Sequence, residues 1–399
     1  MRIVFLSPSG ALGGAETALL DMLAAIREAR PDWTLSVIAA ADGPLLANAA
    51  LYADAAALPF PAALARLGEW GARGSLTSRL RLGAALVAAS APAAGYARRL
   101  RQRLHDLDPD IIHSNGLKMH LLGARVRPPR AKLIWHLHDY PSARRVTARL
   151  LKSQLGRCDA ILANSDSVAE DARRLFGARV PVRTIYNAVD IDRFTPSGPR
   201  VDLDALAGLP RLAAGGIRIG LVATFARWKG HAVFLDALVR LRDLGNVRGY
   251  IVGDSIYQTD ASQFSQRQLR AQAQALGLGE MVGFTGKVND VPSVLRSLDI
   301  AVHASTEPEP FGLAIAEAMA CGVPIVVSRA GGAAEIAQGG ALFHEPGNSA
   351  QLAERIRELA GDPARRDVLG AQGRETALRL FSRARLRNAL MPVYDAIIE

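Results

Sequence analysis

The sequence contains little cysteine and no long apolar run. Its 399 residues include only two cysteines, Cys158 and Cys321, and neither belongs to a Cys-x-x-Cys motif or a Cys/His cluster. A disulfide-stabilised scaffold and a structural zinc site are therefore excluded, and a reducing cytoplasm is the expected location.

The longest uncharged run, residues 82–97, is rich in Ala and contains Pro92. It is shorter than the ~20 residues of a membrane-spanning helix, so we expect no transmembrane helix. The N-terminus enters a glycine-rich loop after a short apolar run and predicts no signal peptide.

The formal net charge of +10 is distributed unevenly. Residues 1–200 contain 27 Lys and Arg against 17 Asp and Glu, whereas residues 201–399 contain 21 of each. Residues 66–104 carry eight arginines and one acid, and residues 142–157 carry five basic residues and no acid. Such segments attract anionic lipid or phosphate, and the scarcity of aromatics there disfavours nucleic acid. They predict docking to an anionic membrane surface or an anionic acceptor, with solvated helix faces as the alternative.

Short apolar runs alternate with helical patterns in both halves of the chain. They are near-continuously apolar, as parallel strands covered on both faces are. In the first half we predict a helix over residues 15–30 and strands at residues 3–7, 35–40, 110–115, 132–139, 160–165 and 182–189. In the second half we predict strands at residues 217–223, 249–254, 281–286, 299–305, 323–328 and 341–345. Two such series predict two Rossmann-like, doubly wound α/β domains.

The two series are separated by residues 195–216, which carry Pro and Gly with little periodicity and predict a linker. We place one domain at residues 1–198 and the other at residues 199–381. A C-terminal helix over about residues 382–399 is expected to pack back onto the first domain. Doubly wound sheets bind ligands outside the carboxyl ends of their strands, so functional residues are expected in the loops that follow the strands.

Residues 305–324, STEPEPFGLAIAEAMACGVP, combine an acidic loop with the start of a helix. An apolar strand leads into the loop, and Phe311-Gly312 opens a helical pattern that must stop at the Cys-Gly-x-Pro sequence. The amides at a helix N-terminus form an anion site suited to a phosphate. Glu309 and Glu317 lie a little over two helical turns apart, so they can face one cleft from different depths. Carboxylates there suit sugar and ribose hydroxyls, which are hydrogen-bond donors.

This segment resembles the retaining family-4 glycosyltransferases, whose motif E-P-F-G-L-x-x-x-E-A-M-A-C-G-x-P matches Glu309 to Pro324. The resemblance extends over nearly the whole chain, in the family's order. Further matches are Gly13-Gly14-Ala15-Glu16 (a glycine loop), His138-Asp139 (a cleft histidine), residues 186–194 (the approach to the linker), residues 227–230 (a phosphate-binding basic pair) and Gly331-Gly332 with Glu335 (a glycine turn). The resemblance implies the GT-B fold, in which two Rossmann-like domains face a central cleft.

The resemblance also implies roles for the residues of the motif. Glu317 would hold the ribose hydroxyls of a nucleotide, and Glu309 would hold hydroxyls of the transferred sugar. The backbone amides of Phe311, Gly312 and Leu313 would face the sugar and its phosphate. A capped helix with two solvated acids is the alternative for a lone pair of glutamates, and the surrounding motif disfavours it.

Two cations, Arg227 and Lys229, follow the predicted strand at residues 217–223 and precede a predicted helix at residues 231–242. Cations at a strand end can neutralise the charge that develops on a departing diphosphate. A solvated loop pair is the alternative. The family often has an arginine about five residues before the lysine, where this chain has Thr224. We therefore assign the phosphate-binding role to Arg227, and Thr224 offers a hydroxyl.

The loop that follows the first predicted strand is rich in glycine. Gly13 and Gly14 let backbone amides approach a phosphate closely. The loop does not match GxGxxG or GxxxxGK[ST], so the dinucleotide and P-loop fingerprints are absent. A simple strand-to-helix turn is the alternative.

Two histidines, His136 and His138, are two residues apart on one predicted strand and should point to the same face. His138 ends that strand, and the resemblance implies that it contacts the donor sugar near the reacting carbon. His113, at the end of another strand, is a second candidate. A hydrogen-bonded structural histidine is the alternative for each. Three others are expected to be structural: His120, His231 and His344.

Asp-x-Asp patterns occur at residues 106–110, 190–192 and 202–204. In transferases of another fold such a pair binds a divalent ion, but none of these three follows a predicted strand in the required way. We interpret them as helix caps and surface acids. We expect no catalytic metal and no cofactor, with a nucleotide-diphosphate sugar as the donor substrate.

Together these features predict a retaining glycosyltransferase that moves a sugar from a nucleotide-diphosphate sugar to a hydroxyl acceptor. The second domain would bind the donor, and the basic first domain would bind an acceptor that is lipid-linked or anionic. Cell-surface polysaccharide, lipopolysaccharide or glycolipid synthesis in the cytoplasm, at the inner face of the membrane, is the expected setting. The alternatives are another GT-B enzyme, such as a sugar-nucleotide epimerase or a sugar-phosphate glycosyl synthase, and a non-catalytic scaffold subunit of a glycan assembly complex.

Overall fold

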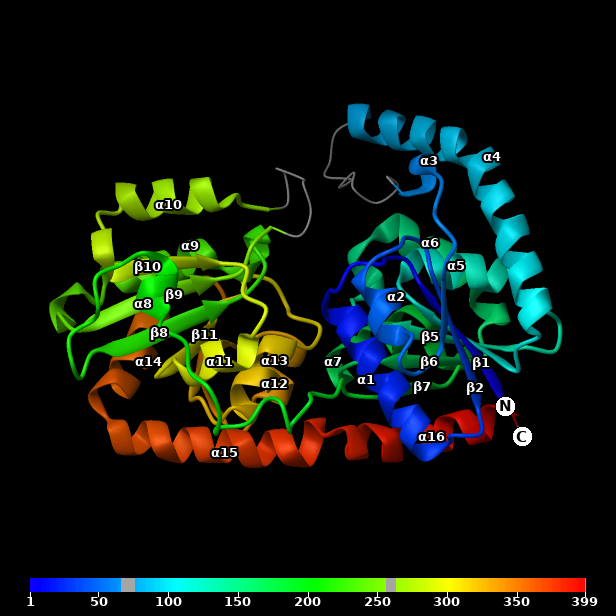
Figure 1. Ribbon diagram of the computed structural model, residues 1–399. Helices are drawn as coiled ribbons and strands as arrows, with labels where there is room; N and C mark the ends of the chain where they lie inside the picture. Colours follow the sequence, from blue (N-terminus) through cyan, green and yellow to red (C-terminus); the bar gives the residue numbers. More distant parts are fainter. Residues whose placement is uncertain (66–75, 256–262, 399) are drawn as a thin grey trace. The chain divides into compact units, whose positions relative to one another are not determined.

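The computed structural model describes residues 1–65, 76–255 and 263–398, and these form two compact units (Figure 1). The first unit contains Met1–Asn187 together with the C-terminal residues from Leu386, and the second contains Ala188–Arg385. The boundaries predicted from the sequence lie after residue 198 and near residue 382. Each unit is described by itself below.

The first unit is built on a seven-stranded parallel sheet in the order β3-β2-β1-β4-β5-β6-β7. Its strands are β1 (Arg2–Ser7), β2 (Thr34–Ala39), β3 (Asp54–Ala57), β4 (Ile111–Asn115), β5 (Lys132–Leu137), β6 (Ala160–Ala163) and β7 (Val182–Thr184). The chain moves outward from β1 to β3, then returns to the other side of β1 and moves outward to β7. The reversal lies between β1 and β4, where doubly wound sheets place their ligand crevice.

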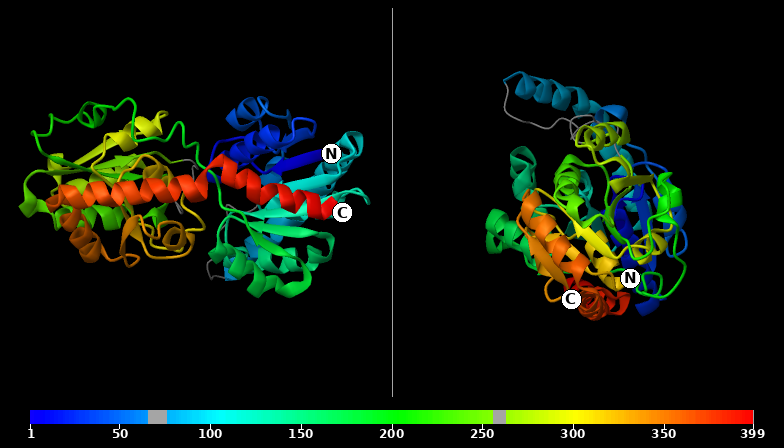
Figure 2. Two further views of the ribbon diagram at one scale, coloured as in Figure 1. Left: turned by 90° about the horizontal axis from the view of Figure 1, so that it is seen from below. Right: turned by 90° about the vertical axis from the view of Figure 1, so that its left-hand side faces the viewer.

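Helices cover both faces of this sheet. They are α1 (Gly14–Ala29), α2 (Pro44–Ala49), α3 (Ala62–Ala65), α4 (Leu76–Leu107), α5 (Leu117–Val126), α6 (Arg145–Gln154), α7 (Asp166–Phe176) and α16 (Arg383–Ile398). Helices α4 to α7 share one apolar core with the strands, which includes the buried Trp135. Helices α1 and α16 meet on the other face, where the Tyr394 hydroxyl lies 3.7 Å from Sδ of Met22. Figure 2 shows α16, in red, lying against this unit.

The second unit contains a six-stranded parallel sheet in the order β10-β9-β8-β11-β12-β13. Its strands are β8 (Ile217–Val222), β9 (Val247–Val252), β10 (Val282–Gly286), β11 (Ile300–His303), β12 (Ile325–Ser328) and β13 (Ala341–His344). The winding direction reverses between β8 and β11, which pair in parallel. The loops that follow these two strands are therefore the first place to look for a ligand site in this unit.

The helices of the second unit again form two layers. They are α8 (Leu203–Ala207), α9 (His231–Val239), α10 (Gln266–Ala275), α11 (Val291–Arg296), α12 (Leu313–Ala320), α13 (Gly332–Ile336), α14 (Ser349–Gly361) and α15 (Pro363–Phe381). Helices α9, α10 and α14 bury their apolar faces with β8, β9 and β11 in one core. Helix α12 packs against α15, and Phe311 meets Phe381 edge to face at 5.6 Å between ring centroids.

The architecture of two doubly wound α/β units is as predicted, but three elements differ. Strand β7 is only three residues long, so the expected strand over residues 182–189 is wrong beyond Thr184. Strand β3 was missed because its sequence, Asp-Ala-Ala-Ala, lacks the β-branched residues that signal a strand. Helix α8 lies inside the predicted linker. Asp202 caps it by accepting from the amide of Ala205, and Gly208 ends it in the left-handed conformation.

Helix α4 contains the Ala-rich run at residues 82–97. Among the described residues, no helix combines the length and the apolar character needed to cross a membrane.

Candidate functional site

An ion pair between Lys229 and Glu309 lies where strands β8 and β11 end. Nζ of Lys229 is 2.6 Å from Oε2 of Glu309, and both side chains are largely buried. The same oxygen lies 3.1 Å from Nε2 of His303 and accepts from the hydroxyl of Ser305 at 3.2 Å. The Ser328 hydroxyl in turn donates to the backbone carbonyl of Ser305 at 2.6 Å. Three strand ends therefore fix the position of one carboxylate.

The surroundings of Glu309 keep its carboxyl ionised. Burial raises the pKa of this group, but the charge of Lys229 and the hydrogen bond from His303 outweigh burial and hold the pKa at about 2. A carboxylate with so low a pKa remains charged at any physiological pH. It is a hydrogen-bond acceptor and a weak base.

Acidification should therefore cost the second unit stability through Glu309. Its pKa is lowered in the folded state from 4.5 to about 2, so its contribution is complete above pH 4.5 and is lost as the pH falls toward 2. The loss is roughly 3 kcal/mol in the free energy of unfolding. Denaturant unfolding of the wild type and Glu309→Gln at several pH values between 6 and 2.5 measures it. The difference between the two proteins should shrink with falling pH, and a constant difference would contradict the assignment.

The basic loop is held against the end of β11 by its backbone. Residues Arg227–Lys229 form one turn of 3-10 helix, and the amide of Thr306 donates to the carbonyl of Trp228 at 2.7 Å. Gly230 follows with a φ of +77°, and a Cβ at this position would lie 1.8 Å from the carbonyl oxygen of Ala304. Only glycine permits this close approach, which places Lys229 within reach of Glu309.

Alanine substitutions at Gly230 and Gly245 should separate the effect of backbone strain on stability from the effect of steric overlap. Both glycines have a φ near +70° (+77° and +70°), but a Cβ on Gly245 would meet no atom within 4 Å. Gly245→Ala should cost about 1 kcal/mol of stability through backbone strain alone. Gly230→Ala should cost about 3 kcal/mol because steric overlap is added. Chemical denaturation of the two variants gives the comparison, and equal costs would mean that the close approach is not rigid.

Arg227, the other predicted cation, has a different environment from Lys229. Its guanidinium lies 4.3 Å from the centre of the Phe264 ring, a cation–π contact. The segment that carries this ring is fixed to the loop, since the amide of Phe264 donates to the carbonyl of Phe225 at 2.8 Å and Gln263 forms a bridge with Ala226. Phe264 therefore positions Arg227. Thr224 lies in the same loop, directly after Ala223.

Helix α12 begins as the sequence predicted. Gly312 is its N-cap residue with a φ of +96°, and a Cβ there would approach a methyl carbon of Ile315 at 2.7 Å. The first amides of a helix, here those of Leu313 and Ala314, have no intrahelical acceptor and can bind an anion, whereas the amide of Ile315 already donates to the carbonyl of Gly312 at 2.9 Å. Leu313 and Glu317 are partly exposed on one side of α12, whereas Ile315 is fully buried. Glu317 is thus on the accessible side of the helix that starts beside Glu309.

The predicted glycine turn also lies against Glu309. The amide of Gly332 donates to the carbonyl of Glu309 at 2.7 Å, and Gly331 forms a parallel bridge with Glu309. Glu335 is half-buried on the short helix α13. The structure therefore brings together the basic loop, the acidic loop and the glycine turn, which are distant in sequence.

In the first unit, Gly13 and Gly14 lie at the start of α1. Gly13 is the N-cap residue, and its amide donates to the Glu16 carboxylate at 3.1 Å. Burial raises the pKa of Glu16. The glycine loop is therefore closed by its own acid, as in a capping box.

His138 lies directly after β5, and one nitrogen of its ring is buried without a hydrogen-bond partner among the described residues. Nε2 is 2.9 Å from Oδ1 of Asn115 at the end of β4, so Nε2 carries the proton and Nδ1 keeps its lone pair. Nδ1 has no hydrogen-bond partner among the described residues. Burial lowers the pKa of His138 to about 4, so the ring is neutral near pH 7. A neutral ring in this tautomer can accept one hydrogen bond at Nδ1, and because this atom is buried a substrate hydroxyl would reach it only if neighbouring side chains move.

Three other histidines of this unit, His113, His120 and His136, are enclosed by protein. The rings of His136 and His138 lie 4.1 Å apart, as expected for residues on one face of a strand. His113 is fully buried, with one nitrogen 3.2 Å from His136 and the other 2.8 Å from the Tyr394 hydroxyl. Both of its nitrogens are used, so His113 has none left for a substrate. The histidines expected to be structural, His120, His231 and His344, are all buried.

The Asp-x-Asp residues include one that is not at the surface. Asp204 is 2% exposed and accepts hydrogen bonds from Arg248 and, at 2.5 Å, from the Tyr250 hydroxyl. The expectation of a surface acid is wrong for this residue, because α8 turns Asp204 inward onto β9. In the described ranges, no group of three or more His, Cys, Asp or Glu side chains is placed to hold a metal ion.

Several residues of the site are not predicted from the sequence. His303 and Ser305 hold Glu309, Asn115 holds His138, and Phe264 holds Arg227. A histidine that interrupts an apolar strand just before the acidic loop was the available signal for His303. The arginines at positions 66 and 73 of the basic stretch lie outside the described residues.

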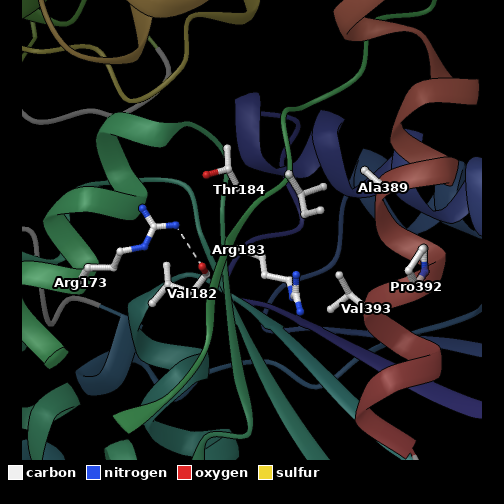
Figure 3. Close-up of a pocket in the computed structure, with 8 residues that line it drawn as sticks. Arg173, Val182, Arg183, Thr184, Ala389, Pro392 and Val393 are labelled. Atoms are coloured by element: carbon white, nitrogen blue, oxygen red, sulfur yellow. Dashed lines mark hydrogen bonds between the residues drawn. The ribbon is translucent and has the colours of Figure 1, made fainter. Parts of the chain in front are cut away.

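A hollow of about 400 Å³ lies elsewhere in the first unit, at the sheet edge formed by β7 (Figure 3). Its lining residues come from α7, β7 and α16: Arg173, Val182, Arg183, Thr184, Ile185, Ala389, Pro392 and Val393. Arg173 donates to the carbonyl of Val182 at 3.1 Å, the dashed line in Figure 3. None of the predicted site residues lines this hollow.

Comparison with known families gives two matches that together span most of the chain. The family Glycosyltransferase Family 4 matches residues 12–193, and Glycosyl transferases group 1 matches residues 211–376. The first match contains Gly13, Gly14 and His138, and the second contains the basic loop and both motif glutamates.

Among known proteins, the chain is 32% identical over 301 residues to D-inositol 3-phosphate glycosyltransferase 2 of Catenulispora acidiphila, covering 72% of this chain and 66% of that protein. It is 28% identical over 304 residues to the lipopolysaccharide core biosynthesis glycosyltransferase LpsD of Rhizobium meliloti, covering 74% and 78%. The alignment thus spans just under two thirds of the first relative's length.

Among solved structures, Anabaena Alr3699/HepE in complex with UDP-glucose superposes with a TM-score of 0.81. The identity is 25%, and the match covers 99% of this chain and 100% of that chain.

Proposed function

This chain belongs to the group 1, family 4 glycosyltransferases, and on that premise we propose that it moves a sugar from a nucleotide-diphosphate sugar to a hydroxyl acceptor with retention at the anomeric carbon. The observation that carries the proposal is the Lys229–Glu309 pair at the start of α12, with a distance of 2.6 Å. One cation, one ionised acid and one helix N-terminus match the phosphate and the hydroxyls of such a donor.

The donor binds to the second unit. Glu317 accepts the ribose hydroxyls from the accessible side of α12, and Glu309 accepts hydroxyls of the transferred sugar. The diphosphate takes its hydrogen bonds from the first amides of α12 and its charge compensation from Lys229 and Arg227. Lys229 can move between Glu309 and a phosphate because its ammonium has three donors on a flexible stem. The complex of the Anabaena protein with UDP-glucose supports a donor of this class.

In the proposed reaction, the bond between the anomeric carbon and the diphosphate oxygen breaks, and the acceptor oxygen bonds to the same face of that carbon. The acceptor proton passes to the departing diphosphate. Lys229, Arg227 and the helix amides stabilise the negative charge on the leaving group. Glu309 is not the nucleophile of a covalent intermediate, because a carboxylate with a pKa of about 2 that accepts three hydrogen bonds is weakly nucleophilic.

The acceptor binds to the first unit. Nδ1 of His138 accepts a hydrogen bond from a hydroxyl of one of the two sugars, and the tautomer set by Asn115 favours this role. The excess of basic residues in the first 200 positions suits an acceptor with phosphate groups or a lipid-linked acceptor at the inner face of a membrane. The relationship to the lipopolysaccharide core enzyme supports an acceptor of this kind.

A donor screen tests the proposal. Thermal shift with UDP, GDP and ADP sugars, starting with UDP-glucose, should identify a donor that stabilises the protein by several degrees. Product analysis by NMR should then give the anomeric configuration of the donor in the product. Assays contain a chelator, since the proposed chemistry requires no metal ion. A protein that none of these nucleotides stabilises would overturn the proposal, and a product formed without an added acceptor would indicate a different GT-B reaction.

A further inference from the structure

Helix α6 (Arg145–Gln154) is one of the helices of the first unit (Figure 1). Its outer face combines exposed aliphatic and basic side chains. Val146 and Leu150 are each 44% exposed, and their spacing of four residues puts them on one side of the helix. Arg145 and Arg149 form a parallel exposed row beside them. Ala148 and Leu151, on the opposite side, are buried in the protein.

The aliphatic pair is therefore not part of the core. Leu151 belongs to the apolar core of the first unit and anchors α6 by its inner side. Val146 and Leu150 lie on the other side of the helix and therefore cannot be buried in the same core. Exposing two neighbouring aliphatic side chains to water is unfavourable in free energy, and burying them against a partner surface would remove this cost.

The charge beside this pair has one sign. Arg144, Arg145, Arg149 and Lys152 are all exposed, and residues 142–157 contain no acid. Within the part of the chain that the structure describes, no carboxylate forms an ion pair with any of these four. The field of the helix surface is therefore positive and uncompensated, and it complements a surface of closely spaced anions.

The helix is also held rigidly in place. The turn before it, Pro141–Ala143, is tied to α7 because Asp171 accepts from the amide of Ser142 at 3.0 Å and from its hydroxyl at 2.7 Å. A preformed helix pays no folding cost when it binds, unlike a disordered basic segment.

We propose that α6 docks this protein onto an anionic lipid bilayer. Val146 and Leu150 enter the boundary between headgroups and acyl chains, while the four cations contact lipid phosphates. Only seven residues, 138–144, separate the end of β5 from α6, so docking would bring acceptor-side residues of the first unit close to the bilayer. The inference adds a partner to the proposed lipid-linked acceptor, yet it is tested without donor or acceptor and can fail independently of it.

Co-sedimentation of the full chain with vesicles tests the proposal. The probes are phosphatidylcholine vesicles with and without phosphatidylglycerol at physiological salt. Binding should require phosphatidylglycerol. The variant R145Q/R149Q/K152Q should bind about 100-fold more weakly, since each cation near an anionic surface contributes about fivefold. V146S/L150S should weaken binding about tenfold while retaining its dependence on salt.

Two matched variants control for total charge and for exposed apolar area. R98Q/R101Q/R103Q removes the same three charges from exposed positions of α4, and L378S removes a leucine that is 41% exposed on α15. Both should bind much more like the wild type than the α6 variants do. Equal losses in the α4 and α6 triple variants would overturn the proposal in favour of general electrostatic attraction. Binding that does not depend on phosphatidylglycerol, or that is as strong in V146S/L150S as in the wild type, would overturn it as well.

Discussion

Replacing Lys229 with alanine is expected to lower kcat by roughly 100- to 1000-fold, the usual effect of removing one preorganised donor to a developing negative charge. The Lys229 ammonium lies 2.6 Å from the carboxylate of Glu309, which precedes α12 by four residues. Its loss removes charge compensation from the leaving diphosphate and leaves the buried Glu309 carboxylate without a cationic ammonium partner, although the contacts with His303 and the Ser305 hydroxyl remain. Steady-state rates with the donor found in the screen measure the effect.

A double variant separates chemistry from stability. Removing one partner of a buried ion pair leaves the other charge uncompensated and costs stability, about 3 kcal/mol or more where the pair is fully buried. In Lys229→Ala/Glu309→Gln that isolated charge is gone, so stability should return toward the wild type while activity remains low. Recovery of activity together with stability would mean that Lys229 has only a structural role. Lys287→Ala, at an exposed position of the same unit, is the surface control and should be neutral in both measurements.

The sequence predicts the strands better than it predicts which single residues contact one another in the site. Near-continuous apolar runs such as Ile325–Ser328 identify buried parallel strands without tertiary information. The pairing of Lys229 with Glu309 spans 80 residues and depends on the adjacency of β8 and β11, which no local pattern contains. The motifs placed both residues at strand ends, and only the strand order determines that these two ends are neighbours.

Buried polar side chains were the least predictable. Asp204 lies in a segment of Pro, Gly and polar residues that reads as a linker, yet it is 2% exposed because Arg248 and Tyr250 satisfy its carboxylate. His303 occupies a position in an apolar strand where its side chain reaches Glu309. Both cases depend on partners from other elements, and burial of a polar group is tolerated only where such partners exist. The sequence shows where a polar residue lies in the chain, but it does not show which residues of other elements will form its hydrogen bonds.

The position of Arg227 likewise depends on a residue that the sequence motif does not contain. The family often has an arginine where this chain has Thr224, and we assign the phosphate-binding role of that arginine to Arg227. The sequence predicts this role but not the position of the Arg227 guanidinium. In the structure its guanidinium stacks on Phe264, 37 positions further along the chain, at 4.3 Å. An arginine held by stacking loses less side-chain freedom when it binds a phosphate, because its planar group is already oriented. We therefore expect Phe264, which is outside the family motif, to support the proposed phosphate-binding role of Arg227.

Replacing Glu317 with alanine should weaken donor binding by roughly 100-fold, because two hydrogen bonds from ribose hydroxyls to a carboxylate are lost, each worth about 1.5 kcal/mol or more. The side chain is on the partly exposed side of α12, and its neighbours Ile315 and Ala318 carry the packing. The thermal midpoint of the unliganded protein should therefore change little. Glu317→Gln, which keeps one acceptor oxygen, should lie between the wild type and the alanine variant.

The identity of the ligand distinguishes the role of Glu317 from that of Lys229. Isothermal titration with the nucleoside monophosphate and diphosphate of the chosen donor should show Glu317→Ala weakened for both, because both carry the ribose. Lys229→Ala should be weakened mainly for the diphosphate. Glu280→Ala, an exposed glutamate of the same unit, should bind both like the wild type. If Glu317→Ala lost affinity only for the diphosphate, its carboxylate would act on the phosphate end of the site, and the assignment to the ribose would be wrong.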